Sequence, residues 1–265
     1  MGHHNIRFAG DPYADSGAWS PPSSRANFCE EDYVVTFYLA EFINSVSNAA
    51  YVYLALRAMY GPGSRGLFAP NWDVMSLSLL VLGVGSFLFH ASLRQTLEFV
   101  DELSMIGIIW SMLQTTLNIR QSAFKARAIS ATLAAVILSF SAFYVWSAKI
   151  IYQVIAFFIG LAAVSCRAQY LYWWAQPEFP RAKARDWNKR TWQAIGICLV
   201  GYIIWNIDLE FCAALRDLKE QIGLPWAWLL ELHGWWHILT AIGADRFMTV
   251  AREVREEALR EKKKA

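Results

Sequence analysis

The sequence contains few charged residues. Only 17% of its 265 residues are charged, against roughly 25% in an ordinary soluble domain. Hydrophobic residues make up 56%, and the formal net charge is only +2. The composition therefore indicates a protein that crosses a bilayer several times and has membrane lipids as neighbours, and it gives no reason to expect nucleic acid as a partner.

Two further features are missing. The first thirty residues contain no long apolar run, and a cleavable signal peptide needs one. We therefore expect membrane insertion to begin with the first spanning helix. Proline is absent from the interior of every long apolar stretch, whereas interrupted helices are typical of transporters. A transporter or channel is thus disfavoured.

Seven stretches are apolar enough to span a bilayer, which takes about 20 residues. They are 34–59, 72–90, 98–117, 128–146, 150–174, 191–207 and 228–250. The predicted fold is all-α, a polytopic membrane protein built as a seven-transmembrane-helix bundle. We divide the chain into an N-terminal segment (1–33), the membrane domain (34–250) and a basic tail (251–265).

Basic residues predict how the bundle is oriented. Seven spans place the two termini on opposite sides, and most Lys and Arg residues fall on the C-terminal side. The C-terminus is therefore expected in the cytosol and the N-terminus in the lumen. Lys262 and Lys263 near the chain end fit a dilysine retrieval signal for the endoplasmic reticulum, or simply the basic end of an amphipathic helix.

Three of the five histidines lie in the expected spans, where an ionisable side chain is costly and marks a candidate functional site. They are His90, His233 and His237. His233 and His237 are four residues apart on one helix, and the span order places all three at one membrane level. Three imidazoles are the ligand count of a catalytic zinc. Haem ligation and hydrogen-bonded packing are the alternatives.

Two polar residues are expected at the same level. Ser86 lies one helical turn before His90, and Asp101 begins the next span on the same side. Zinc on three imidazoles would activate water. Asp101 could take and return the proton, and Ser86 could orient the water or stabilise an oxyanion. This chemistry is hydrolysis of a substrate that arrives through the bilayer, such as a lipid.

The first expected span carries a polar helix face. Its members recur at intervals of three and four residues: Glu41, Asn44, Ser45 and Asn48. The two asparagines and the serine are typical of hydrogen bonding between membrane helices. Glu41 differs, because a buried carboxylate needs a cation or a proton.

Four separated motifs resemble the alkaline ceramidases, within the wider superfamily of seven-span metal-dependent lipid hydrolases. They are NFCEEDYVVTFYLAEFINSVSN, GSFLFH followed by DEL, WNID, and HGWWHIL. The resemblance runs from about residue 27 to 244. It implies an amidase that cleaves a ceramide-type lipid to a sphingoid base and a fatty acid.

The resemblance also implies roles for individual residues. His90, His233 and His237 match zinc ligands, and Ser86 and Asp101 match the catalytic serine and aspartate. A calcium site is implied around the residues Asn27, Phe28 (through its carbonyl), Glu30, Asp32 and Glu41.

The calcium motif departs from the family pattern in two places. The pattern reads Asp-Trp-Cys-Glu-Glu-Asn, whereas this chain has Asn27 at the first position and Asp32 at the last. The number of carboxylates is unchanged, so calcium binding is still expected.

The family further implies a disulfide between Cys29 and Cys212 on the lumenal side, where disulfides persist. Cys166 and Cys198 are expected to be packing residues. The leading hypothesis is a zinc-dependent ceramidase of the endoplasmic reticulum or Golgi membrane. The competing hypothesis is a receptor resembling the adiponectin receptors, whose N-terminus lies in the cytosol.

Overall fold

The structure is a computed structural model that describes residues 11–26 and 28–264. Within these residues, every regular element is a helix. They are α1 (Phe42–Ser47), α2 (Ala49–Met59), α3 (Val74–Ser92), α4 (Gln95–Asn118), α5 (Ala123–Ser147), α6 (Ile150–Trp173), α7 (Arg181–Glu210), α8 (Cys212–Ile222), the 3-10 helix η1 (Trp226–Leu230) and α9 (Leu232–Lys264). The predicted all-α class is thereby confirmed.

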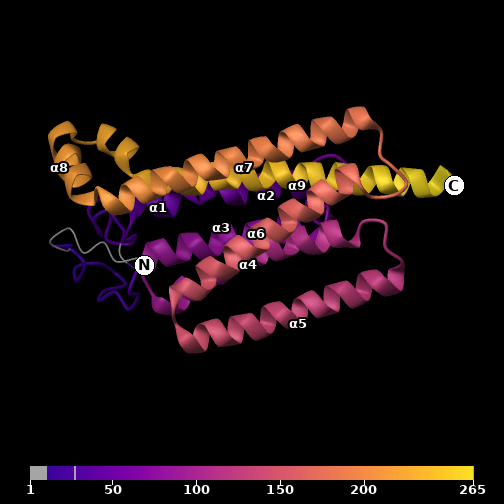
Figure 1. The fold of residues 1–265 in the computed structure, drawn as a ribbon. Helices are drawn as coiled ribbons and strands as arrows, with labels where there is room; N and C mark the ends of the chain where they lie inside the picture. The colour runs from indigo at the N-terminus through magenta and orange to yellow at the C-terminus, as the bar shows by residue number, and fades with distance from the viewer. Residues whose placement is uncertain (1–10, 27, 265) are drawn as a thin grey trace.

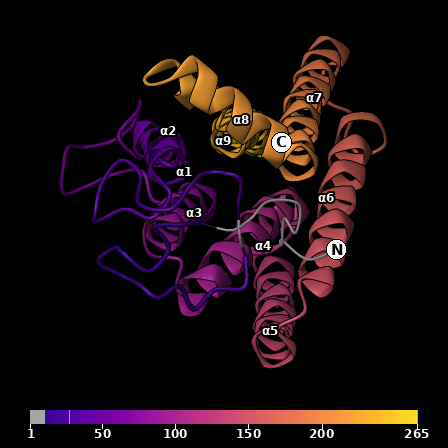
Figure 2. The same cartoon turned by 90° about the vertical axis from the view of Figure 1, so that its left-hand side faces the viewer.

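The long helices run side by side along one axis (Figure 1). We call the left-hand end in that view, where α8 lies, the α8 end, and the opposite end the C-terminal end. Seen from the α8 end, α5 stands at the edge of the bundle and packs mainly against α4 (Figure 2). The helices α7 and α9 form the most extensive pair.

Among the described residues, four helices are long and apolar enough to cross a membrane: α3, α5, α6 and α7. Only a small share of the most apolar part of α5 and α6 is buried, whereas that of α3 is more than half buried. Apolar helices that expose such surfaces suit a lipid environment. The chain is thus a multi-pass membrane protein.

The other expected spans differ for a physical reason. Helices α4 and α9 are long, but they carry polar residues that the bundle buries, among them Glu102 and His237. Hydropathy assumes that a helix faces lipid, and it therefore underrates helices that turn polar groups inward.

The first expected span starts later than predicted. Residues 34–41 form turns, α1 begins at Phe42, and a break at Asn48 separates α1 from α2. The reason is visible in the backbone: the N–H groups of Ala40 and Glu41 donate to the carbonyls of Ala91 and His90. These bonds hold the chain extended against the end of α3 and prevent an earlier helix start.

The pair α1–α2 lies between α3 and α9 and contacts both. Two glycines permit this close approach. A Cβ on Gly83 of α3 would lie 2.8 Å from the Cβ of Tyr51, and one on Gly234 of α9 would lie 2.9 Å from Ile43 Cγ2. Small residues let membrane helices pack backbone to backbone, so α1 sits directly between the two helices that carry the three histidines.

Helix α9 continues to Lys264, so residues 251–264 of the expected tail are the end of this helix. Val254 and Ala258 are buried. Ion pairs connect α9, from Asp245 onward, to the surrounding elements: Arg57–Asp245, Arg120–Glu261, Lys183–Glu257, Arg190–Glu253 and Arg252–Asp73.

Asp73 provides a stability test at the C-terminal end. Its carboxylate caps α3 by accepting from the Ser76 N–H at 3.0 Å, and it pairs with Arg252. Burial alone would raise the pKa of Asp73, but the Ser76 N–H and the Arg252 guanidinium outweigh it and lower that pKa.

We expect Asp73→Ala to cost about 1 kcal/mol through the lost cap and to lower the thermal unfolding midpoint by roughly 2–4 °C. Asp73→Asn keeps the cap and should lose less. Because the pKa is depressed, the charge contribution is present above the ordinary value of 3.8 and is lost as the pH falls through the folded value. Equal midpoints for wild type and Asp73→Ala at pH 7 would contradict this assignment.

Candidate metal centre

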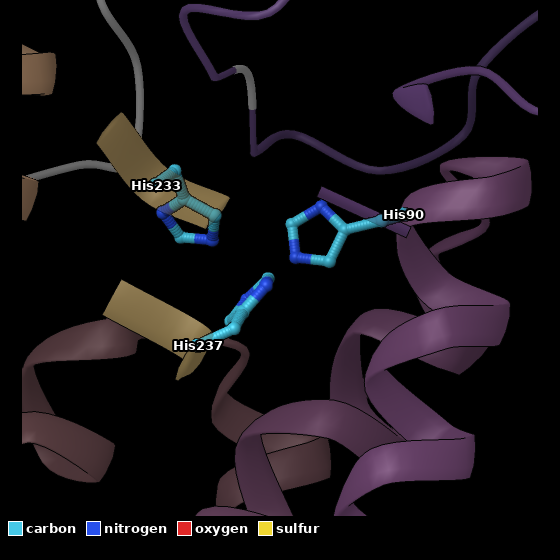
Figure 3. Close-up of side chains that lie close together, drawn as sticks. All are labelled: His90, His233 and His237. Carbon is cyan, nitrogen blue, oxygen red and sulfur yellow. The ribbon is translucent and has the colours of Figure 1, made fainter. Parts of the chain in front are cut away.

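Three buried histidines face one another at the α8 end of the bundle. His90 comes from the last turn of α3, and His233 and His237 come from the first turns of α9. One ring nitrogen from each lies within 4.8 Å of the others. The rings point into a shared space (Figure 3). The structure thus brings together all three histidines that the sequence singled out, in a cluster that could hold a metal ion.

The outer nitrogens of two rings already have partners. Glu41 Oε2 lies 2.6 Å from His90 Nδ1, and Ser47 Oγ lies 2.8 Å from His237 Nδ1. Metal-binding histidines usually bond one nitrogen to an acceptor, which fixes the tautomer and leaves the other for the ion. Both rings can therefore present Nε2, and neutral imidazoles of this kind fit zinc.

Ser47 was not among the residues predicted from the sequence. It lies three positions after Asn44, on the same helical surface as the polar face of the first expected span. Its hydroxyl also lies 3.0 Å from the Asn44 carbonyl, so one lone-pair region can face the imidazole. The i, i+3 spacing was the available signal, but only the packing of α1 against α9 shows which histidine it meets.

Ser86 and Asp101 lie on neighbouring helices, α3 and α4, and the Ser86 hydroxyl donates to the Asp101 carboxylate. Ser86 is buried one turn before His90. Ser86 therefore links the Asp101 carboxylate to the end of α3 that carries His90, and a carboxylate held by a hydroxyl is suited to transferring protons.

Next to the histidines, the segment before α1 gathers carboxylates. The Glu30 carboxylate accepts from the N–H groups of Ile43 at 2.6 Å and Asn44 at 2.8 Å, so it caps α1. Asp32 and Glu41 are buried beside it. Within the described residues, Asp32 Oδ1, Glu41 Oε1 and Asn44 Oδ1 have no hydrogen-bond partner. Buried oxygens of this kind fit a hard cation such as Ca²⁺.

The raised pKa values of the carboxyl groups in this segment also indicate that it needs a cation. Burial, with the carboxylates of Glu231 and Glu41 nearby, raises the pKa of Glu30 well above its ordinary value. Burial, with Glu41 and Asp11, raises the pKa of Asp32 to about 8. Without a cation, these crowded carboxylates favour protons. Of the other expected calcium ligands, Phe28 is buried with its ring 4.4 Å from that of His233, and Asn27 lies outside the described residues.

A disulfide between Cys29 and Cys212 fastens this segment to α8, as predicted. The two Cα atoms lie 5.3 Å apart. Arg216 Nε and Lys219 Nζ of α8 donate to the Cys29 carbonyl at 3.0 and 3.3 Å. Lys219 also pairs with Glu231, two residues before His233, at 2.8 Å. Helix α8 therefore holds both the carboxylate segment and the start of the histidine-bearing helix α9 in place.

These observations define a class: a helical multi-pass membrane protein with a buried three-histidine cluster at one end. Residues 20–265 match the profile of the family described as Ceramidase. The chain therefore belongs to the ceramidase family, which is a family of hydrolases.

Several curated relatives have the same kind of name. The chain is 28% identical to alkaline ceramidase 3 of Mus musculus over 86% of this chain and 82% of that protein. It is 30% identical to alkaline ceramidase YPC1 of Saccharomyces cerevisiae over 86% of this chain and 75% of that protein. It is 24% identical to an alkaline ceramidase of Arabidopsis thaliana over 89% and 87%. These similarities extend over most of each chain.

The histidine cluster predicts metal retention. The histidine cluster of the purified protein should bind one transition-metal ion in addition to any calcium, and His237→Ala should lose that ion because only two imidazoles remain. Ser47→Ala should weaken binding by roughly 10–100-fold, the usual effect of losing a partner that orients a ligand. Metal analysis during titration with a chelator measures both effects.

Val46→Ala is the control, because this neighbouring side chain on α1 is exposed. It should leave metal affinity unchanged. Full metal retention by a folded His237→Ala variant would rule out the cluster as the binding site.

Proposed function

We propose that this protein hydrolyses the N-acyl bond of ceramide, or of dihydro- or phytoceramide, to a sphingoid base and a free fatty acid. The carrying observation is the buried cluster of His90, His233 and His237 at the α8 end. Membership of the ceramidase family supports the same reaction. The reaction adds the elements of water across the amide: OH joins the carbonyl carbon, and H joins the departing nitrogen.

The three histidines would hold zinc. A zinc ion bound there would lower the pKa of a water molecule and polarise the amide carbonyl. His90 and His237 are pre-oriented for this role by Glu41 and Ser47. Orientation of this kind costs no rearrangement when the substrate arrives.

Asp101 would move the proton. It takes a proton from the attacking water and later delivers it to the amine nitrogen as the carbon–nitrogen bond breaks. Ser86 holds the Asp101 carboxylate through its hydrogen bond. The Ser86 oxygen keeps lone pairs with which it would orient the water. Once Asp101 has taken the proton, the Ser86 hydroxyl would be free to turn and donate to the developing oxyanion.

The substrate would enter from the bilayer, because the helices around the site are membrane helices. We propose seven spans: α1 and α2 together, then α3, α4, α5, α6, α7 and α9. The distribution of basic residues supports a lumenal α8 end and a cytosolic C-terminus. We place the protein in the endoplasmic reticulum or Golgi membrane, as the resemblance to the alkaline ceramidases implies.

Calcium would bind at Asn27, the Phe28 carbonyl, Glu30, Asp32 and Glu41. Three partnerless oxygens in this region and the raised pKa values of Glu30 and Asp32 support a cation there. Glu41 is the residue that connects the two sites, because its Oε2 contacts His90 while its Oε1 has no partner among the described residues. Calcium would thereby stabilise or regulate the zinc centre.

Asp101→Asn tests the proton transfer. We expect ceramide turnover to fall about 10²–10⁴-fold, the range for loss of a general acid–base group, while zinc content stays unchanged. Ser86→Ala should lower turnover less. Fatty-acid release from ceramide by the purified protein measures both.

Ser104→Ala is the matched control on α4, since the Ser104 hydroxyl donates to the Val100 carbonyl and has no part in the proposed chemistry. Wild-type turnover by a folded Asp101→Asn variant would refute the assigned role.

Glu41→Gln tests the link between the two metal sites. Removing this charge should weaken calcium binding and, through His90, lower zinc affinity by roughly 10–100-fold. Calcium titration of activity and chelator competition for zinc measure the two effects separately.

Glu31→Gln is the control. Glu31 lies in sequence between the proposed ligands Glu30 and Asp32, but its carboxylate is 3.9 Å from Arg216 and is not an expected calcium ligand. If Glu41→Gln changes neither the calcium response nor zinc affinity, the proposed link is wrong.

A further inference from the structure

Helix α8 turns its charged residues toward the protein. Cys212, Arg216 and Lys219 are its buried residues. They form the disulfide, the bonds to the Cys29 carbonyl and the ion pair with Glu231. A surface helix of a soluble protein normally buries apolar residues and exposes charged ones. The side of α8 that packs on the bundle is therefore polar, which leaves its apolar residues elsewhere.

Those apolar residues share one exposed face. Successive residues of a helix lie about 100° apart. Phe211, at the N-cap, and Leu218 and Ile222 of α8 consequently fall within one narrow sector beside the buried face, and all three are exposed.

A third face, on the other side of α8, is polar. It carries Asp217, Glu220 and Gln221, which are also exposed. The helix therefore has a protein face, an apolar face and a polar face in separate sectors. Separate apolar and polar exposed faces are the signature of a helix that lies in a membrane surface.

The position of α8 in the chain supports this environment. It follows α7, an apolar helix long enough to span a bilayer, and precedes η1 and α9 at the same end of the bundle (Figure 1). The segment after it continues the apolar surface, with Leu224, Trp226 and Leu229 each more than half exposed. Tryptophan is enriched at the boundary between hydrocarbon and water.

We propose that α8 and the segment through Leu229 form an interfacial element that inserts Phe211, Leu218, Ile222 and Trp226 into the bilayer leaflet at the α8 end. The occupant of this face is the lipid of that leaflet. Because the buried face of α8 holds Cys29 and Glu231, the leaflet surface sets the position of the carboxylate segment and of the residues just before His233. This inference requires only the membrane location and not the proposed reaction.

Labelled cysteines test the insertion in the full-length protein reconstituted into phosphatidylcholine vesicles. Cys166 and Cys198 are replaced by Ala, the Cys29–Cys212 disulfide is kept, and a polarity-sensitive fluorophore is attached to Leu218→Cys, Ile222→Cys or Glu220→Cys. The Glu220→Cys variant is the matched control, because it is exposed on the polar face of the same helix.

We expect the labels at 218 and 222 to emit at shorter wavelength and to be quenched several-fold more by a nitroxide placed shallowly on the lipid chains than the label at 220. Aqueous iodide should quench the label at 220 preferentially. If all three labels respond alike to iodide, the face contacts water and the proposal fails. If the labels at 218 and 222 are shielded from both quenchers, the face contacts a second copy of the protein and the proposal also fails.

A second measurement uses the native cysteines, so a folding defect in the replaced background does not decide the result. Brominated lipids should quench part of the tryptophan emission, and Trp226→Phe should remove a component quenched by bromines near the headgroup. Trp146, exposed at the end of α5, provides a comparison through Trp146→Phe. An unchanged quenching profile in Trp226→Phe would overturn insertion at that residue.

Discussion

The contact between Glu41 and His90 holds the α8 end of the bundle together. It joins the start of α1 to the end of α3 at 2.6 Å, with both side chains fully buried. The adjacent backbone bonds from Ala40 and Glu41 to the end of α3 reinforce it. The His90 imidazole and the Asn44 amide both contact the buried Glu41 carboxyl group through its Oε2. The placement of α1 between α3 and α9, and thus the meeting of the three histidines, depends on this contact.

The distribution of apolar and polar residues among the helices fits a protein surrounded by a bilayer. Helices α5 and α6 are strongly apolar, yet very little of their most apolar part is buried, whereas α4 and α9 bury Glu102, His233 and His237. In water this arrangement would be inside out. In lipid it keeps these charged and imidazole side chains inside the protein and gives the apolar surfaces a hydrocarbon neighbour. The site therefore occupies the part of the molecule where polar side chains are sheltered from lipid by apolar helices.

The histidine cluster was largely predictable, because span order alone places the end of one helix and the starts of two others at one level. The pairing of Cys29 with Cys212 followed from the family resemblance. Other features did not follow from local sequence. The late start of α1 depends on backbone bonds to α3, which lies about fifty residues away in the chain, and the contact of Ser47 with His237 depends on packing against the last helix. Helix α8 has no long apolar run, and its apolar face is not the one that packs on the protein, because the protein side carries Arg216 and Lys219.

The bond between Cys29 and Cys212 closes a covalent ring with a sequence separation of 183. Every helix from α1 to α7 lies inside that ring, while η1 and α9 lie beyond it. A protease that cuts once in the exposed turn around Phe68, or once near Trp174, would open the ring without releasing a fragment. A single cut between α8 and α9 would instead free the helix that carries His233 and His237 from covalent attachment. The molecule therefore has two regions of very different tolerance to a broken backbone, and the boundary between them lies just before the metal-binding helix.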